Sequence, residues 1–224
     1  MAYISFKPSD YISTLLYTGT GSSLANTGVG FQPDFTWIKS RSHTNYHTLT
    51  DSVRGVTKQI FSNTTDGEQT DATNLSSFDS DGFTVVSAND TNGSARTYAS
   101  WNWKMGTTTG LSGGTITPSS YSIDATRKQG VYAWTGTGTA GTIAHGLGTA
   151  PDFVMVKKLN ASGTYWTGYS SVFPNPTTEE NYWNSDDSIG GSSTSWNSTA
   201  TTSTTFSLGS SNGINGSGNT YVGY

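Results

Sequence analysis

Two aspartates with the spacing of calcium ligands are the first residues of this chain whose types could do chemistry. Asp79 and Asp81 lie in the run DSDG, which ends at Gly82. A calcium loop of the EF-hand type has ligands at positions 1, 3 and 5 and a glutamate at position 12. Counted from Asp79, position 5 is Phe83 and position 12 is Asp90. The run therefore predicts a tight turn before a strand, and we assign no metal and no cofactor to it.

The histidines are the next candidates, because imidazole binds metals and transfers protons. His43 and His47 are four residues apart and would share one face of a helix, but no third ligand is evident. His145 lies in a glycine-rich turn, where a turn or surface residue is expected. His47, Asp51 and Ser52 have the residue types of a hydrolase triad, but no Gly-x-Ser-x-Gly turn surrounds Ser52. We assign no catalytic residue and predict that the protein is not an enzyme.

Two carboxylate pairs, Glu179-Glu180 and Asp186-Asp187, have the residue types of the acid and base of a glycosidase. Both pairs lie in a polar stretch rich in asparagine and serine. That setting favours a solvated loop over an acid–base pair. A glycan-degrading enzyme is therefore the least favoured function for this chain.

Aromatic residues in the polar second half of the chain are the best candidates for a binding site. They are Tyr165, Trp166, Tyr169, Tyr182, Trp183 and Trp196. Rings exposed among asparagine and aspartate are typical of surfaces that bind sugars or proteins, whereas a small β-sandwich also needs rings in its core. Both interpretations stay open from the sequence. We take Tyr165, Trp166, Trp183 and Trp196 as the candidate receptor-binding residues.

A cassette of glycine, proline and aspartate occurs twice and predicts where two strands begin. Residues 28–39 read GVGFQPDFTWIK, and residues 146–157 read GLGTAPDFVMVK. Proline lacks an N–H and restricts φ, so it can start a strand but not lie inside one. We therefore expect the apolar runs after the two prolines, at 35–39 and 153–157, to be core strands.

The cassette belongs to a longer internal repeat. Tyr17-Thr-Gly-Thr-Gly21 matches Trp134-Thr-Gly-Thr-Gly138, and Asn92-Gly-Ser matches Asn215-Gly-Ser. Several matches in register indicate that one folding unit was duplicated. Short strands with frequent turn residues predict an all-β fold of two tandem, jelly-roll-like β-sandwiches. We place the first repeat at residues 1–106, a linker at 107–120 and the second repeat at 121–224.

The composition limits the partners of the chain. Of its 224 residues only 12% are charged, the formal net charge is −4, and no basic residue follows Lys158. Such a chain has no electrostatic reason to bind nucleic acid or an anionic membrane. Disulfides and thiolate metal sites are excluded because there is no cysteine. No apolar run approaches the ~20 residues of a membrane helix, so we expect neither nucleic acid nor membrane as a partner.

With the repeat aligned, the chain resembles a known family. The motifs that carry the resemblance are Tyr17-Thr-Gly-Thr-Gly21, Gly30-Phe-Gln-Pro-Asp-Phe-Thr-Trp-Ile-Lys-Ser-Arg-Ser42, Asp51-Ser-Val-Arg-Gly55, Phe78-Asp-Ser-Asp-Gly-Phe83 and Tyr98-Ala-Ser-Trp-Asn-Trp-Lys104. They are similar to a domain of unknown function that occurs, often in tandem, in structural proteins of tailed bacteriophages, many of them marine. The resemblance covers nearly the whole chain. It implies a virion component, often labelled a tail fibre or tail protein, with no catalytic residue to transfer.

Together, the residues and the resemblance predict a non-enzymatic virion structural protein of tail-fibre type, assembled in the host cytoplasm. Its loops are expected to attach to a glycan or protein of the host surface. Its other expected partners are virion proteins and further copies of itself, for which a trimer is one candidate assembly. The alternative is a capsid decoration or adaptor protein that binds neighbouring virion subunits.

Overall fold

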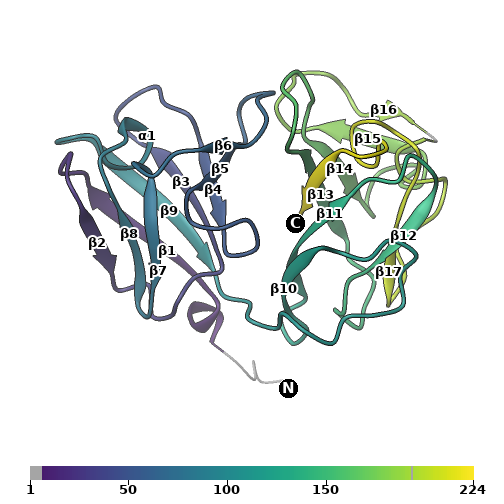
Figure 1. Cartoon of the computed structure of the whole chain (residues 1–224), viewed down its shortest axis with the longest axis horizontal. Helices are drawn as coiled ribbons and strands as arrows, with labels where there is room; N and C mark the ends of the chain where they lie inside the picture. The colour runs from purple at the N-terminus through teal and green to yellow at the C-terminus, as the bar shows by residue number, and fades with distance from the viewer. Residues whose placement is uncertain (1–6, 193) are drawn as a thin grey trace. The chain divides into compact units, whose positions relative to one another are not determined.

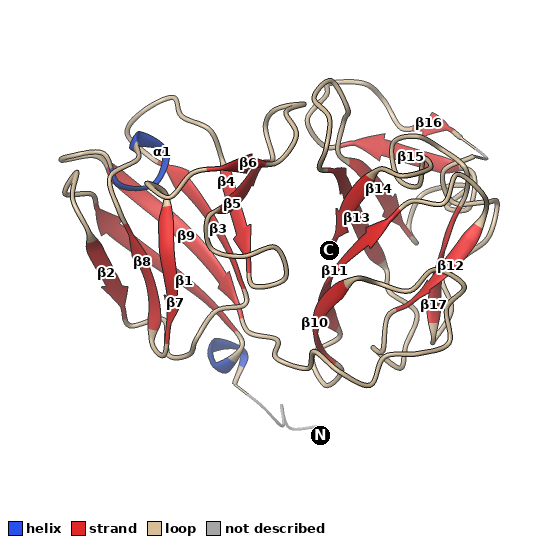
Figure 2. Cartoon of the chain, in the orientation of Figure 1, coloured by secondary structure: helices blue, strands red, loops and turns tan. Residues whose placement is uncertain are grey.

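The computed structural model describes residues 7–192 and 194–224, which form two compact units. The first unit comprises Met1–Phe61 and Gln69–Met105, and the second comprises Ser62–Glu68 and Gly106–Tyr224. Figure 1 labels the elements, and Figure 2 shows that the regular secondary structure of both units is almost entirely strand. The named strands pair antiparallel within their sheets. The predicted all-β class is confirmed.

Helical structure is limited, within the described residues, to the 3-10 helix η1 (Pro8–Asp10) and the single turn α1 (Asn89–Asn92). In this part of the chain, no helix has the length and apolar character needed to cross a membrane.

The first unit is built from two antiparallel sheets. The larger follows the order β1-β9-β3-β4-β5-β6, and the smaller follows β2-β8-β7. Their strands are β1 (Ile12–Thr18), β2 (Leu24–Thr27), β3 (Phe35–Ser40), β4 (Thr48–Asp51), β5 (Lys58–Phe61), β6 (Gln69–Thr70), β7 (Leu75–Asp79), β8 (Gly82–Val85) and β9 (Thr97–Trp103). Ile38 and Tyr98 of the larger sheet meet Phe83 and Val85 of the smaller sheet in one core. The unit is therefore a β-sandwich.

The second unit also has one large and one small antiparallel sheet. The large sheet follows β10-β11-β18-β13-β14-β15-β16, and β12 pairs with β17 in the small one. The strands are β10 (Ser120–Asp124), β11 (Gln129–Thr135), β12 (Gly141–Ala144), β13 (Phe153–Lys158), β14 (Thr167–Ser170), β15 (Glu179–Tyr182), β16 (Gly190–Gly191), β17 (Thr205–Leu208) and β18 (Thr220–Gly223). Trp134 and Tyr221 of the large sheet share a core with Phe206 and Leu208 of the small one.

The larger sheets of the two units have corresponding strand orders. The run β1-β9-β3-β4-β5-β6 of the first unit corresponds, place by place, to β11-β18-β13-β14-β15-β16 of the second. In the smaller sheets, β2 pairs with β8 as β12 pairs with β17. The two proline cassettes lead into β3 and β13, which occupy the same place in these orders. A duplicated unit would produce this correspondence, and duplication itself stays a prediction.

The segment at 107–120, which we expected to be a linker, is instead part of the second unit. Thr107 forms a bridge with Ile123, and Ile116 forms one with Ile143 of β12. Ile116 is only 5% exposed and belongs to the core of the unit. The Gly/Ser/Thr-rich sequence of the segment concealed this role, because only Ile116 and the partly buried Leu111 pack against the core.

Residues 62–68, which we placed in the first repeat, also belong to the second unit. The N–H of Glu68 donates to the carbonyl of Leu159 at 2.7 Å. The N–H of Gly67 donates to the hydroxyl of Ser162 at 3.3 Å. The partners of this segment are therefore nearly a hundred residues away in the sequence, and no local pattern in the chain could reveal them.

A buried asparagine amide joins separate loops of the first unit. Asn92 is fully buried. Its Oδ1 accepts the N–H of Thr20 at 2.9 Å, and its Nδ2 donates to the carbonyls of Ser22 at 2.6 Å and Val86 at 2.7 Å. One side chain thus satisfies three backbone groups that would otherwise lack partners where the strands end.

Asn215 makes the corresponding contacts in the second unit and is also fully buried. Its Oδ1 accepts the N–H of Thr137 at 3.0 Å, and its Nδ2 donates to the carbonyls of Thr139 at 2.8 Å and Gly209 at 2.7 Å. Glycine precedes the threonine because a Cβ on Gly136 would lie 2.8 Å from a ring carbon of Tyr221. The shared Thr-Gly-Thr-Gly and Asn-Gly-Ser motifs are therefore explained by close backbone packing around one amide.

The aspartate of each proline cassette anchors a neighbouring hairpin. Asp34 precedes β3, and its carboxylate accepts the hydroxyl of Ser52 at 2.9 Å and the N–H of Met105 at 2.8 Å. Asp152 precedes β13 and accepts the hydroxyl of Ser171 at 2.7 Å. Each serine directly follows the next strand of the sheet, β4 or β14. The aspartate of the Pro-Asp pair therefore ties the start of one strand to the end of its neighbour.

Lys157 of β13 is a fully buried cation. Its ammonium donates to the carbonyl of Thr164 at 2.5 Å. Burial lowers the pKa of Lys157 from its usual 10.5 to about 8, and the negative charge of Asp66 opposes that shift. The charged form is therefore held in a setting that favours the neutral amine.

We predict that Asn92→Ala lowers the free energy of unfolding by about 2–4 kcal/mol, because three backbone groups lose their buried partner. Asn215→Ala should produce a loss of similar size. Chemical denaturation followed by tryptophan fluorescence measures both. Asn92→Asp keeps the acceptor but removes both donors, so it should also destabilise the protein. A loss below about 0.5 kcal/mol in either alanine variant would show that water replaces the amide.

We predict that the stability of Lys157→Met relative to the natural chain depends on pH. Below pH 8 the folded natural chain keeps Lys157 charged and buried, which is unfavourable. Between pH 8 and 10.5 the folded state releases this proton while the unfolded state retains it, so the natural chain gains stability. The advantage of the methionine variant should therefore shrink above pH 8, by at most about 1.4 kcal/mol per pH unit. Denaturation curves from pH 7 to pH 9.5 test this, and a constant difference would contradict it.

Candidate functional site

The aspartates with calcium-like spacing form the hairpin turn between β7 and β8. The carboxylate of Asp81 accepts the N–H groups of Gly28 at 3.0 Å and Gly30 at 2.6 Å. Asp79 accepts the hydroxyl of Thr84 at 2.7 Å. Both carboxylates thus bind groups of the chain, and the predicted turn before a strand is present. Within residues 7–192 and 194–224, no group of three or more acidic or histidine side chains could hold a metal ion.

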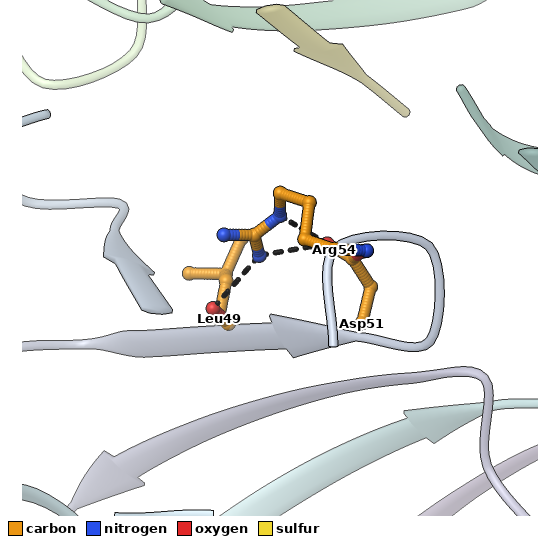
Figure 3. A network of polar contacts seen from close by, with 3 residues as sticks. All are labelled: Leu49, Asp51 and Arg54. Atoms are coloured by element: carbon orange, nitrogen blue, oxygen red, sulfur yellow. Dashed lines mark hydrogen bonds and ion pairs between the residues drawn. The ribbon is translucent and has the colours of Figure 1, made fainter. Parts of the chain in front are cut away.

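Asp51, a member of the possible hydrolase triad, is instead paired with arginine (Figure 3). Arg54 donates from Nε to Asp51 Oδ2 at 2.7 Å, and its Nη2 lies 2.7 Å from the same oxygen. Nη2 also donates to the carbonyl of Leu49 at 3.1 Å. Both charged side chains are almost fully buried. This ion pair closes the turn after β4 and explains why the Asp-Ser-Val-Arg-Gly motif contains both charges.

Ser52, another member of the possible triad, also has a structural partner. The hydroxyl of Ser52 donates to Asp34, so it is not directed at a histidine. Burial, followed by the positive charge of Lys39, lowers the pKa of His47. In a triad the serine hydroxyl donates to the histidine, whereas here it donates to Asp34.

His145 is fully buried, so the expectation of a turn or surface residue is wrong as regards the surface. Its Nδ1 accepts the N–H of Leu147 at 3.0 Å, which places the proton on Nε2. Nε2 then donates to the carbonyl of Thr202 at 3.0 Å. Burial lowers the pKa of His145. Both ring nitrogens stabilise the loops around β12, and neither is directed at a substrate.

One of the two carboxylate pairs differs from the solvated loop that we expected, because Glu179 and Glu180 both lie in strand β15. Asp186 and Asp187 are exposed, but Glu180 lies in β15 and is only 7% exposed. The hydroxyl of Tyr182 donates to Glu180 Oε1 at 2.8 Å. Burial, with the bond to Glu180 next in importance, raises the pKa of Tyr182 to about 12. Glu180 therefore has a structural role within β15, where it accepts a hydrogen bond from Tyr182.

Two of the four candidate receptor-binding residues are core residues. Trp166 is fully buried, and Trp196 is only 2% exposed. Trp196 packs edge-on against Tyr169, with ring centroids 5.6 Å apart. A polar sequence neighbourhood suggested exposure for both, but their side chains fill the second unit. They cannot contact a receptor unless the second unit unfolds.

The other two candidates, Tyr165 and Trp183, are exposed, and each packs against a second ring. Tyr165 is 39% exposed and lies parallel to Tyr182, with centroids 4.8 Å apart. Trp183 is 42% exposed and lies 5.0 Å from Phe153, which is 41% exposed. We call these the tyrosine pair and the tryptophan pair. Phe153 was missed because its apolar run predicted a buried strand.

A glycine in β14 makes room for the tryptophan pair. A Cβ added at Gly168 would lie 2.7 Å from Nε1 of Trp183, so a larger residue would displace the indole. Gly168 pairs with Met155 of β13 and with Asn181 of β15. The indole of Trp183 therefore lies over the middle strand of these three. Three neighbouring strands thus hold two exposed rings in fixed positions.

Comparison with known proteins gives one match. No curated protein and no solved structure matches the chain. The model of DUF7483, a domain of unknown function, matches residues 7–224, a range that includes strands of both units. Because this match takes in almost the entire sequence, the chain belongs to the DUF7483 family.

Proposed function

We propose that the chain is a non-enzymatic structural protein of a tailed-phage virion, of tail-fibre type, whose exposed ring pairs contact glycans of the host surface. The observation that carries the binding part of this proposal is the tryptophan pair. Trp183 and Phe153 are both about 40% exposed and are held by three strands. The virion assignment is supported only by the resemblance of the repeated motifs to phage structural proteins.

Exposed aromatic rings on a rigid sheet suit a sugar ligand for physical reasons. A flat ring offers apolar area against the C–H face of a pyranose, and it loses little conformational entropy on binding. The ring pairs therefore have the chemistry of a carbohydrate-binding surface.

The charge of the second half of the chain narrows the class of glycan. After Lys158 there is no basic residue, and four acidic residues follow. An anionic polysaccharide would meet no counter-charge there. The proposed ligand is consequently a neutral or amine-bearing glycan.

We propose that the protein has no catalytic role, because the best candidate catalytic residues are bonded to other groups of the fold. Asp51 is bonded to Arg54, both ring nitrogens of His145 hydrogen bond to the backbone, and Glu180 accepts from Tyr182. Each group is thus engaged in holding strands or turns together. General acid–base catalysis needs a group within reach of a substrate.

The alternative function, a capsid decoration or adaptor protein, is favoured by a different observation. Ile12 and Leu16 of β1 are 45% and 59% exposed. Apolar side chains at this exposure are more typical of a subunit contact than of a sugar site.

We predict that Trp183→Ala weakens glycan binding at least about tenfold, since a buried aromatic contact is worth more than 1.4 kcal/mol in an interface. Tyr165→Ala should weaken it if the tyrosine pair also contributes. The measurement is a glycan array followed by titration calorimetry with the best ligand. Val172→Ala is the matched control, because Val172 is 85% exposed and belongs to neither pair.

The binding and virion parts of the proposal fail separately. A natural chain that binds no glycan and no host cell would refute attachment. Gold-labelled antibody on intact particles locates the chain. Label on the tail supports the fibre assignment, label spread over the capsid supports the decoration protein, and unlabelled particles refute both.

A further inference from the structure

The outer edge of β1 lacks a strand that the second unit has at the corresponding place. In the large sheet of the second unit, β10 covers the edge of β11. In the first unit the sheet order begins at β1, so no described strand pairs with its outer edge. The second unit therefore shows what this type of sheet accepts there, namely one more antiparallel strand.

The hydrogen-bond pattern identifies which groups of β1 point outward. Just before the strand, the N–H of Lys104 donates to the carbonyl of Tyr11, which makes these two residues opposite members of a bonded pair. Bonded pairs alternate along an antiparallel ladder. Thr14 and Leu16 therefore direct their N–H and C=O groups away from β9, ready to bond a further strand.

The sequence of β1 lacks two features that commonly protect a free edge. Its sequence, ISTLLYT, contains no charged residue and no proline. Natural proteins commonly blunt an edge with lysine, proline or a bulge. In β1, by contrast, the apolar side chains of Ile12 and Leu16 are exposed. An edge of this kind is a template for strand pairing.

We propose that β1 pairs antiparallel with β1 of a second copy of this chain, about a two-fold axis at Thr14. Ile12 and Leu16 are spaced equally on either side of Thr14, so this register places Ile12 of one copy opposite Leu16 of the other. Each exposed apolar side chain is then covered by its counterpart. Because the strand is uncharged, no like charges oppose each other across the pair.

The proposed contact has the symmetry expected of a dimer. A two-fold interface uses the same patch on both copies and leaves no further edge for growth at that site. It joins the two six-stranded sheets into one. A single strand pair buries less area than a standard interface, so we expect a reversible dimer.

The first test removes an outward N–H without changing the ladder to β9. Thr14→Pro lacks the N–H that would bond the second copy, and proline is tolerated on edge strands when that group faces solvent. Thr14→Val is the matched control because it retains the N–H. Sedimentation equilibrium should give a concentration-dependent dimer for the natural chain and for the valine variant, and a monomer for the proline variant.

Leu16→Lys is a second variant that does not alter the backbone. It places a cation opposite Ile12 of the other copy, and at 59% exposure Leu16 can be replaced without loss of the core. It should also give a monomer, with an unchanged melting temperature at low concentration. The proposal is overturned if the natural chain is monomeric at high concentration, or if an oligomer of any size persists in both variants.

The second test locates the axis. In a hydrogen-bonded antiparallel pair the Cα atoms are about 5.5 Å apart, within the range of about 4.4–6.8 Å that a disulfide spans. The chain has no cysteine, so Thr14→Cys can cross-link only to its counterpart. Mild oxidation should give a covalent dimer, and Ser203→Cys, in an exposed loop, should not. Equal cross-linking of the two variants would overturn the proposed register.

Discussion

One buried asparagine amide in each unit is the interaction on which the rest of the structure depends. Asn92 and Asn215 each bind three backbone groups from two separate loops. In a chain without cysteine, such contacts replace covalent cross-links. They join the loop between β1 and β2 to the end of β8, and the loop between β11 and β12 to the end of β17. The tight glycine turns and the stacked ring of Tyr98 or Tyr221 follow from this close approach.

The use of polar side chains for contacts within the fold also explains which side chains remain available for binding. Asp34, Asp51, Asp81 and Glu180 all have partners within the fold. Their charges stabilise turns and strand starts, so few groups are left to do chemistry. Exposed rings remain as the distinctive surface. A scaffold whose polar residues are used internally is suited to contact through shape and stacking.

The sequence predicted the parts of the fold that depend on local rules. The strands after the two prolines begin where the cassettes place them, at Phe35 and Phe153, because proline and an apolar run act over a few residues. Burial of individual rings was not predictable. Trp196 and Trp183 both lie in polar sequence, yet one fills the core and the other is exposed. Which face a ring occupies depends on strand pairing with distant residues, and no local pattern records that.

The membership of Ser62–Glu68 in the second unit has a consequence for how the chain matures. A ribosome makes this segment early, but Leu159 and Ser162, to which it bonds, emerge almost a hundred residues later. The loop must therefore stay available while most of the remaining polypeptide is translated. The second unit can reach its final form only after the first half has been synthesised. The connectivity of the chain therefore sets the order in which its parts assemble.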